Sequence, residues 1–242
     1  MRTTLTFVIL TLLWAAAGQI GARAAAPEEV AYSAAAGGLK GFLCRPQGAG
    51  PFAAIVYNHG GLGTIIGGPP EATCAALAEA GFVGFAPIRR QTVPMIGHLD
   101  DVMAGLAYVR NLAYVDPARV AMMGFSRGGA LTFMAAAQGA AIKAAIILAA
   151  ASPPPASGFT LDAAPSITVP LLLLVAENDT GSRTTQGQNT LEGMRRMKAA
   201  LDKTGRPARL VVYPATMRDG HQTFFEIGPY WKDVVAFLRQ QL

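Results

Sequence analysis

Short apolar runs alternate along the chain with segments in which small and apolar residues recur at helical spacing. A continuous apolar run such as residues 52–57 is typical of a strand that is buried on both faces of a sheet. The predicted strands are residues 39–44, 52–57, 82–86, 119–123, 142–149, 169–176 and 210–213. The predicted helices are residues 71–80, 96–111, 127–138, 189–203 and 230–240.

This alternation of strands and helices predicts an α/β fold with a mainly parallel sheet and helices on both faces. The rhythm fails only between Ala151 and Thr168, where three consecutive prolines and a Ser-Gly pair exclude a long helix. That interval is too short for a sizeable lid. We therefore expect an open site with a minimal lid or none.

The first 24 residues have the pattern of a secretory signal peptide. Arg2 supplies the positive start, residues 5–17 are almost entirely apolar, and Ala22-Arg23-Ala24 offers small residues for cleavage. The apolar run is shorter than the roughly 20 residues that a membrane-spanning helix needs. We expect cleavage, with a retained anchor as the alternative, and a single domain over residues 25–242. The protein is then periplasmic or secreted and meets the membrane only transiently during export.

Composition narrows the classes of partner. The chain is 52% hydrophobic and 14% charged, which suits one globular domain with a sizeable core. Without Arg2 and Arg23 the formal charge falls from +5 to +3, and the remaining basic residues are scattered, so nucleic-acid binding is not expected. Cys44 and Cys74 are too few for a thiolate metal cage, and the sequence leaves open whether they form a disulfide.

The strongest chemical signal is a G-x-S-x-G pattern around Ser126, between a predicted strand and a predicted helix. In a nucleophile elbow the serine has a strained backbone, and side chains at the two glycine positions would collide with the adjoining strand or helix. Ser126 is therefore the predicted nucleophile. No metal or organic cofactor is required for its chemistry.

A serine hydroxyl needs a base and an acid that orients the base. With this elbow, the triad follows the chain order serine, acid, histidine, and among the three histidines only His221 follows Ser126. The acid is expected on the loop after the strand ending at residue 176, where Asp179 is preferred. Glu177 is the alternative, and Asp162 is weaker because its loop follows an earlier strand.

Two backbone amides are predicted to form the oxyanion hole. The glycine-rich segment 58–63 follows the strand at 52–57, in the position where this chemistry places a donor, and we assign the N–H groups of Gly61 and Arg127. His59 is then expected to brace the loop. For Arg89 and Arg90, two roles stay open: binding of a substrate carboxylate, or solvated surface charge.

Together these motifs resemble the dienelactone hydrolase family and the neighbouring prolyl oligopeptidase-type hydrolases, from about Val30 to the C-terminus. The segments that carry the resemblance are residues 58–61, 100–110, 115–120, 124–129, 177–179 and 219–221. The resemblance implies an α/β-hydrolase catalytic domain over residues 25–242. Dienelactone hydrolases carry cysteine as nucleophile, whereas this chain has Ser126. Secreted members with serine are similar to carboxylesterases.

We therefore expect a serine hydrolase that cleaves carboxylic esters of small molecules through an acyl-enzyme intermediate. Two alternatives remain. A serine peptidase or amidase would act on short peptides and would be separated by amide substrates. A non-catalytic binding protein on the same fold would fail to react with a serine-directed probe.

Overall fold

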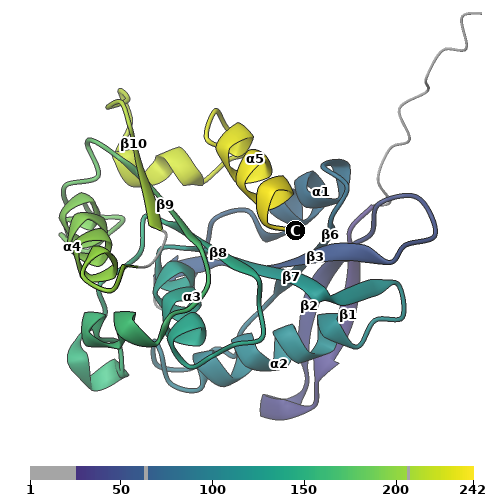
Figure 1. Ribbon diagram of the computed structural model, residues 1–242. Helices are drawn as coiled ribbons and strands as arrows, with labels where there is room; N and C mark the ends of the chain where they lie inside the picture. Colours follow the sequence, from purple (N-terminus) through teal and green to yellow (C-terminus); the bar gives the residue numbers. More distant parts are fainter. Residues whose placement is uncertain (1–25, 63–64, 206–207) are drawn as a thin grey trace, which may run out of the picture.

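The computed structural model describes residues 26–62, 65–205 and 208–242. Its centre is an eight-stranded sheet in the order β1-β2-β6-β3-β7-β8-β9-β10 (Figure 1). All pairings from β6 to β10 are parallel, while β1 and β2 are antiparallel at one edge. The predicted signal peptide lies outside the described residues.

The strands of this sheet are β1 (Glu28–Ser33), β2 (Leu39–Cys44), β3 (Phe52–Asn58), β6 (Val83–Pro87), β7 (Val115–Phe125), β8 (Ala144–Leu148), β9 (Leu171–Ala176) and β10 (Ala208–Tyr213). The helices are α1 (Pro70–Glu79), α2 (His98–Arg110), α3 (Arg127–Ala137), α4 (Thr190–Asp202) and α5 (Trp231–Gln241). A separate hairpin joins β4 (Gly60–Leu62) to β5 (Ile65–Gly67). The mainly parallel α/β architecture predicted from the sequence is confirmed.

Helices cover both faces of the sheet. Figure 1 shows α1 and α5 on one face and α2 and α3 on the other, and α3 packs on β7 and β8. Because both faces are covered, every residue of β8 and β9 is buried. This explains why these strands are uniformly apolar in the sequence.

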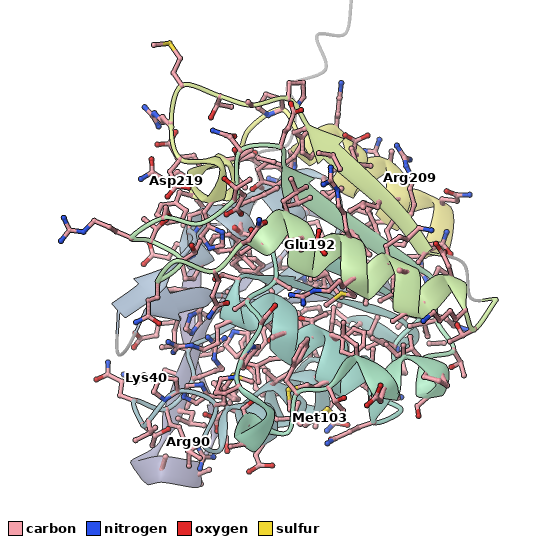
Figure 2. All side chains as sticks on the ribbon, turned by 90° about the vertical axis from the view of Figure 1, so that its left-hand side faces the viewer. Lys40, Arg90, Met103, Glu192, Arg209 and Asp219 are labelled. Atoms are coloured by element: carbon pink, nitrogen blue, oxygen red, sulfur yellow. A yellow bond between two sulfur atoms is a disulfide. The ribbon has the colours of Figure 1, made fainter. Side chains whose placement is uncertain are left out.

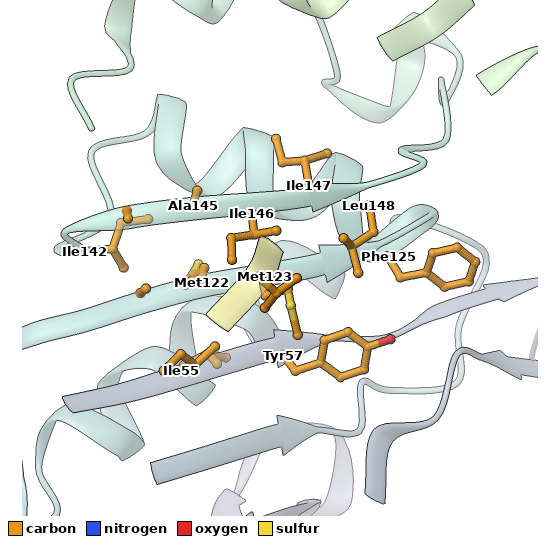
Figure 3. Packing of buried hydrophobic residues seen from close by; sticks show 14 of the residues in the cluster. Ile55, Tyr57, Met122, Met123, Phe125, Ile142, Ala145, Ile146, Ile147 and Leu148 are labelled. Carbon is orange, nitrogen blue, oxygen red and sulfur yellow. The ribbon is translucent and has the colours of Figure 1, made fainter. Parts of the chain in front are cut away.

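The layer between the sheet and its helices is filled by large apolar side chains. Ile55 and Tyr57 of β3, Met122 of β7 and Ile146 of β8 are fully or almost fully buried (Figure 3). Burial of each such side chain contributes about 1.5–3 kcal/mol relative to exposure. The core thus holds the central strands, and with them the loops at their carboxyl ends, in a fixed register.

Two features were not predicted. Strand β1 has only Tyr32 buried, so its sequence lacks the apolar signature of a sheet strand. Strands β4 and β5 pair where the sequence predicted only an oxyanion loop over residues 58–63.

Cys44 of β2 and Cys74 of α1 form a disulfide, with their Cα atoms 5.5 Å apart. The bond links the antiparallel edge of the sheet to the first helix. It closes a loop of 30 residues, which in the chain-entropy description stabilises the fold by about 3.6 kcal/mol.

Candidate active site

Ser126 lies at the sharp turn between β7 and α3. Its backbone has φ 53° and ψ −117°, a conformation that non-glycine residues rarely adopt. A Cβ on Gly124 would lie 2.2 Å from the carbonyl oxygen of Gly128, and a Cβ on Gly128 would lie 1.9 Å from that of Asn58. Both positions therefore require glycine, because the backbone approaches too closely for any side chain.

Ser126, His221 and Asp179 form a hydrogen-bonded chain. The Oγ of Ser126 is 3.0 Å from Nε2 of His221, and Nδ1 of His221 is 2.8 Å from Oδ2 of Asp179. The acidic partner fixes the tautomer: Nδ1–H donates to Asp179, and Nε2 accepts from the serine hydroxyl. Glu177, the alternative acid, has an exposed side chain.

Each of these three residues follows the carboxyl end of a parallel strand: Ser126 follows β7, Asp179 follows β9 and His221 follows β10. Carboxyl ends of parallel strands meet at one edge of the sheet, which is where such folds place their sites. Asp179 is completely buried and His221 almost so, whereas Ser126 is partly accessible. A ligand can therefore reach the serine while the other two groups stay dry.

The loop that carries His221 is anchored by a network that the sequence analysis missed. Asp219 accepts hydrogen bonds from the His221 amide at 3.1 Å, from Ser182 Oγ at 2.6 Å, and from Thr184 Oγ1. Burial raises the pKa of the Asp219 carboxyl, but these hydrogen bonds outweigh it and hold the pKa below its ordinary value. Figure 2 shows Asp219 among the loops at this end of the molecule.

Close backbone packing also holds the acid and histidine loops together. A Cβ on Gly220 would lie 2.4 Å from the amide nitrogen of Asp179, so only glycine permits this approach. The Phe125 ring packs against the His221 imidazole with centroids 4.7 Å apart. The histidine is thus held between a ring and a carboxylate. The Asp-Gly-His sequence marks the loop, but its partners Ser182 and Thr184 lie more than 30 residues upstream.

The predicted oxyanion loop lies beside Ser126. Gly61 and Arg127 both line the cavity that Ser126 and His221 open into. The carbonyl oxygen of Gly60 is 2.6 Å from Nδ1 of His59, which donates to it. Because a peptide is planar and trans, holding the Gly60 carbonyl in one direction points the Gly61 N–H in the opposite direction.

Arg89 supports the same peptide from the carboxyl end of β6. Its Nη2 donates to the carbonyl of His59 at 2.7 Å and approaches that of Gly60 at 3.4 Å. The side chain is 4% exposed, and burial, with the nearby charge of Arg127, lowers the pKa of Arg89 to about 9. Burial and the charge of Arg89 also lower the pKa of His59 well below its ordinary value, so His59 is neutral.

Neither role considered for Arg89 and Arg90 describes what the structure contains. Arg89 contacts backbone carbonyls, while Arg90 forms an ion pair with the buried Asp101 at 2.5 Å. Neither lines the cavity at Ser126. The sequence offered no signal for the contact between Arg89 and His59, because the two residues lie 30 positions apart.

The described residues outline two cavities that open at Ser126. The larger has a volume of about 510 Å³ and the smaller about 180 Å³. Within the described ranges, no cluster of three or more His, Cys, Asp or Glu residues could hold a metal ion. Over the same ranges, no helix has the length and apolar character needed to cross a bilayer.

Solved structures with similar folds identify the fold. A putative dienelactone hydrolase from Klebsiella pneumoniae subsp. pneumoniae has a TM-score of 0.66 and 20% identity, covering 88% of this chain and 98% of its own. The carboxylesterase EstE1, cloned from a metagenomic library, has a TM-score of 0.70 and 18% identity, covering 90% of each chain. At these identities the likeness shows the fold alone, and that fold is the α/β-hydrolase fold.

A larger enzyme shares the fold as well. Dipeptidyl peptidase 4 from Porphyromonas gingivalis has a TM-score of 0.70 and 20% identity over 89% of this chain. This chain spans only 35% of that peptidase, and 41% of the similar acylaminoacyl peptidase from Pyrococcus horikoshii.

The family follows from a sequence comparison. The family model for dienelactone hydrolases matches residues 88–221, which is more than half of the chain. The chain belongs to the dienelactone hydrolase family, which confirms the resemblance noted from the motifs. No curated protein matches it.

Proposed function

We propose that the protein is a serine hydrolase that cleaves carboxylic esters of small molecules through an acyl-enzyme intermediate. The observation that carries this proposal is the hydrogen-bonded chain from Ser126 through His221 to the buried Asp179, with distances of 3.0 and 2.8 Å. Serine, unlike cysteine, has almost no anionic form at neutral pH, so it depends on such a base.

In the first half of the reaction, His221 takes the proton from Ser126 as its Oγ attacks the ester carbonyl carbon. Asp179 stabilises the imidazolium that forms and keeps Nε2 directed at the serine. The N–H groups of Gly61 and Arg127 stabilise the oxyanion. His221 then gives its proton to the leaving alcohol, and Ser126 is left acylated.

In the second half, water replaces the alcohol. His221 takes a proton from the water as it attacks the acyl carbon, and the same amides stabilise the second tetrahedral intermediate. Collapse of that intermediate returns the proton to Ser126 Oγ and releases the carboxylic acid. The enzyme is regenerated without any redox change or cofactor.

A peptidase or amidase is the second candidate, because dipeptidyl peptidase 4 and acylaminoacyl peptidase share the fold. Esters are favoured because the cavity at Ser126 is lined by side chains without a carboxylate to bind a peptide amino terminus, within the described residues. A matched pair of p-nitrophenyl butyrate and butyryl p-nitroanilide separates the two candidates. Ester turnover well above anilide turnover supports the proposal, and preference for the anilide contradicts it.

The nucleophile is tested in the same assay. Ser126→Ala should lower kcat by about 10⁴–10⁶, as loss of a triad nucleophile does in other hydrolases. Ser152→Ala is the matched control, because Ser152 has an exposed side chain. Full ester turnover by a folded Ser126→Ala protein would refute the assignment.

We further propose that the protein is exported and acts in the periplasm or outside the cell, with residues 1–24 removed as a signal peptide. The disulfide between Cys44 and Cys74 supports this location, because disulfides persist in oxidising compartments. The mass of the protein recovered from the periplasm or culture medium tests it. A protein that retains residues 1–24 in the cytosol contradicts it.

A further inference from the structure

The two cavities at the candidate site meet at the reacting groups. The larger, of about 510 Å³, and the smaller, of about 180 Å³, share four lining residues: Gly61, Ser126, Thr184 and His221. The nucleophile therefore lies where two adjoining spaces meet. An ester carbonyl has two substituents, one on each side of the carbon that the nucleophile attacks.

The larger cavity is lined by two kinds of surface. Residues 93–96 contribute mostly apolar groups, as do Ala151, Pro153, Pro154 and Ala156. Thr185, Gln186 and Gln188 contribute hydroxyl and amide groups. Among the described lining residues, none is acidic and Arg127 is basic. This lining suits a bulky substituent that has apolar faces and neutral oxygen or nitrogen groups, and it offers a cation no carboxylate partner.

The smaller cavity is different in size and chemistry. Beyond the four shared residues it is lined by Ile66, Gly67, Phe125 and Phe225. Its volume is about a third of that of the larger cavity, so it suits a smaller substituent. A compact apolar or aromatic group fits this lining best.

The rims of both cavities carry exposed apolar side chains. Val93 is 72% exposed and Ile96 is 61% exposed at the larger cavity, and Ile66 and Phe225 are 40% and 37% exposed at the smaller one. Over the described part of the chain, only two other large hydrophobic residues are exposed, Val212 and Met217. Exposed apolar groups gathered at a site indicate contact with an apolar ligand.

We propose that the two cavities hold the two sides of the scissile bond. The substrate is an ester with a bulky amphipathic substituent in the larger cavity and a compact apolar substituent in the smaller, and neither substituent carries a positive charge. This inference rests on the proposed esterase function. The acyl side and the alcohol side of the ester are thus selected independently, by different walls.

The test is a grid of esters in which the acyl group and the alcohol group are enlarged one at a time. Ala156→Trp, on the exposed wall of the larger cavity, narrows that space, and Ile66→Trp narrows the smaller one. Ala156→Trp should lower kcat/KM by 10-fold or more for esters enlarged on one side of the carbonyl. Ile66→Trp should do so for esters enlarged on the other side. Val212→Trp, an exposed residue on β10, is the control and should change neither series.

Each outcome has a distinct meaning. If wild type hydrolyses the grid but both tryptophan variants affect the same side, or neither exceeds the control, the two-cavity inference is wrong and the esterase function stands. If wild type hydrolyses no ester in the grid, the proposed function itself fails. Ser157→Trp, on the larger cavity, replaces Ala156→Trp if that variant has a lowered Tm.

A matched pair of esters tests the preference for an uncharged substituent. A choline ester and its neutral isostere, the 3,3-dimethylbutyl ester, differ only in a positive charge. Wild type should hydrolyse the neutral ester at least 10-fold faster in kcat/KM. Preference for the choline ester would overturn this part of the inference.

Discussion

Arg89 is expected to act on catalysis without touching the substrate. Its Nη2 donates to the carbonyl of His59 at 2.7 Å and helps to fix the direction of the Gly60–Gly61 peptide. Arg89→Met introduces an apolar side chain of similar length and removes the donor. A hydrogen bond from a charged group contributes about 1.5–3 kcal/mol. If that energy is lost from the oriented oxyanion peptide, kcat should fall by roughly 10- to 100-fold, since about 1.4 kcal/mol corresponds to one factor of ten.

The expected fall in kcat has an upper limit. Loss of a complete oxyanion donor lowers the rate by about 10² to 10³. His59 still donates to the Gly60 carbonyl in Arg89→Met, so the peptide stays partly oriented. The double variant with His59→Ala should approach the full limit.

The assay separates orientation from general damage. KM for a p-nitrophenyl ester and the inhibition constant of a trifluoromethyl ketone, which forms a tetrahedral adduct, are measured together with kcat. Orientation predicts that kcat falls and the inhibition constant rises by the same factor while KM stays constant. Arg209→Met is the control, because Arg209 is largely exposed and lies apart from Asp219 in Figure 2.

The fold is expected to tolerate Arg89→Met. Nε and Nη1 of Arg89 have no hydrogen-bond partner among the described residues, so the variant also removes a costly buried charge. A folded Arg89→Met protein with unchanged kcat, or with a raised KM as its only effect, would refute the role of Arg89.

Three further changes test other parts of the structure. Gly128→Ala should prevent folding or lower the Tm sharply, because its Cβ would lie 1.9 Å from the Asn58 carbonyl oxygen; an unchanged Tm would contradict the elbow geometry. Replacing Cys44 and Cys74 by alanine should lower the free energy of unfolding by about 3.6 kcal/mol in urea titrations, and a loss below about 1 kcal/mol would show that the disulfide is not formed. Burial lowers the pKa of His98 to about 4, so the unfolded chain takes up a proton near pH 6.5 before the folded chain does. Above about pH 6.5 His98 is neutral in both states and does not change the free energy of unfolding. As the pH falls from about 6.5 toward 4, the free energy of unfolding should decrease by at most about 1.4 kcal/mol per pH unit. His98→Gln should remove that part of the pH dependence.

The sequence predicted the elements that have a strong periodic signal. Strand β9 is buried along its whole length, so its apolar run was unambiguous. Strand β1 was missed because it lies at the sheet edge with one buried residue, Tyr32. The β4–β5 hairpin was missed because glycines carry no pattern of burial.

The residues of the candidate site were also predicted only in part. Chain order and strand ends led to Ser126, Asp179 and His221, which the fold then brings into hydrogen-bonding distance. The contacts of Arg89 and Asp219 could not be predicted, because their partners lie 30 or more residues away along the chain and are chosen by the packing of loops. For the same reason the two cavities could not be derived from sequence, since six separate segments of the chain line the larger one.

Activation of the Ser126 nucleophile by His221 can be tested by covalent labelling. The purified protein is treated with a fluorophosphonate, and the site of modification is located by mass spectrometry of its peptides. The account predicts one adduct per chain, on Ser126, and a rate of labelling that falls strongly in His221→Ala. A folded protein that is not labelled, or that is labelled at another residue, would contradict it.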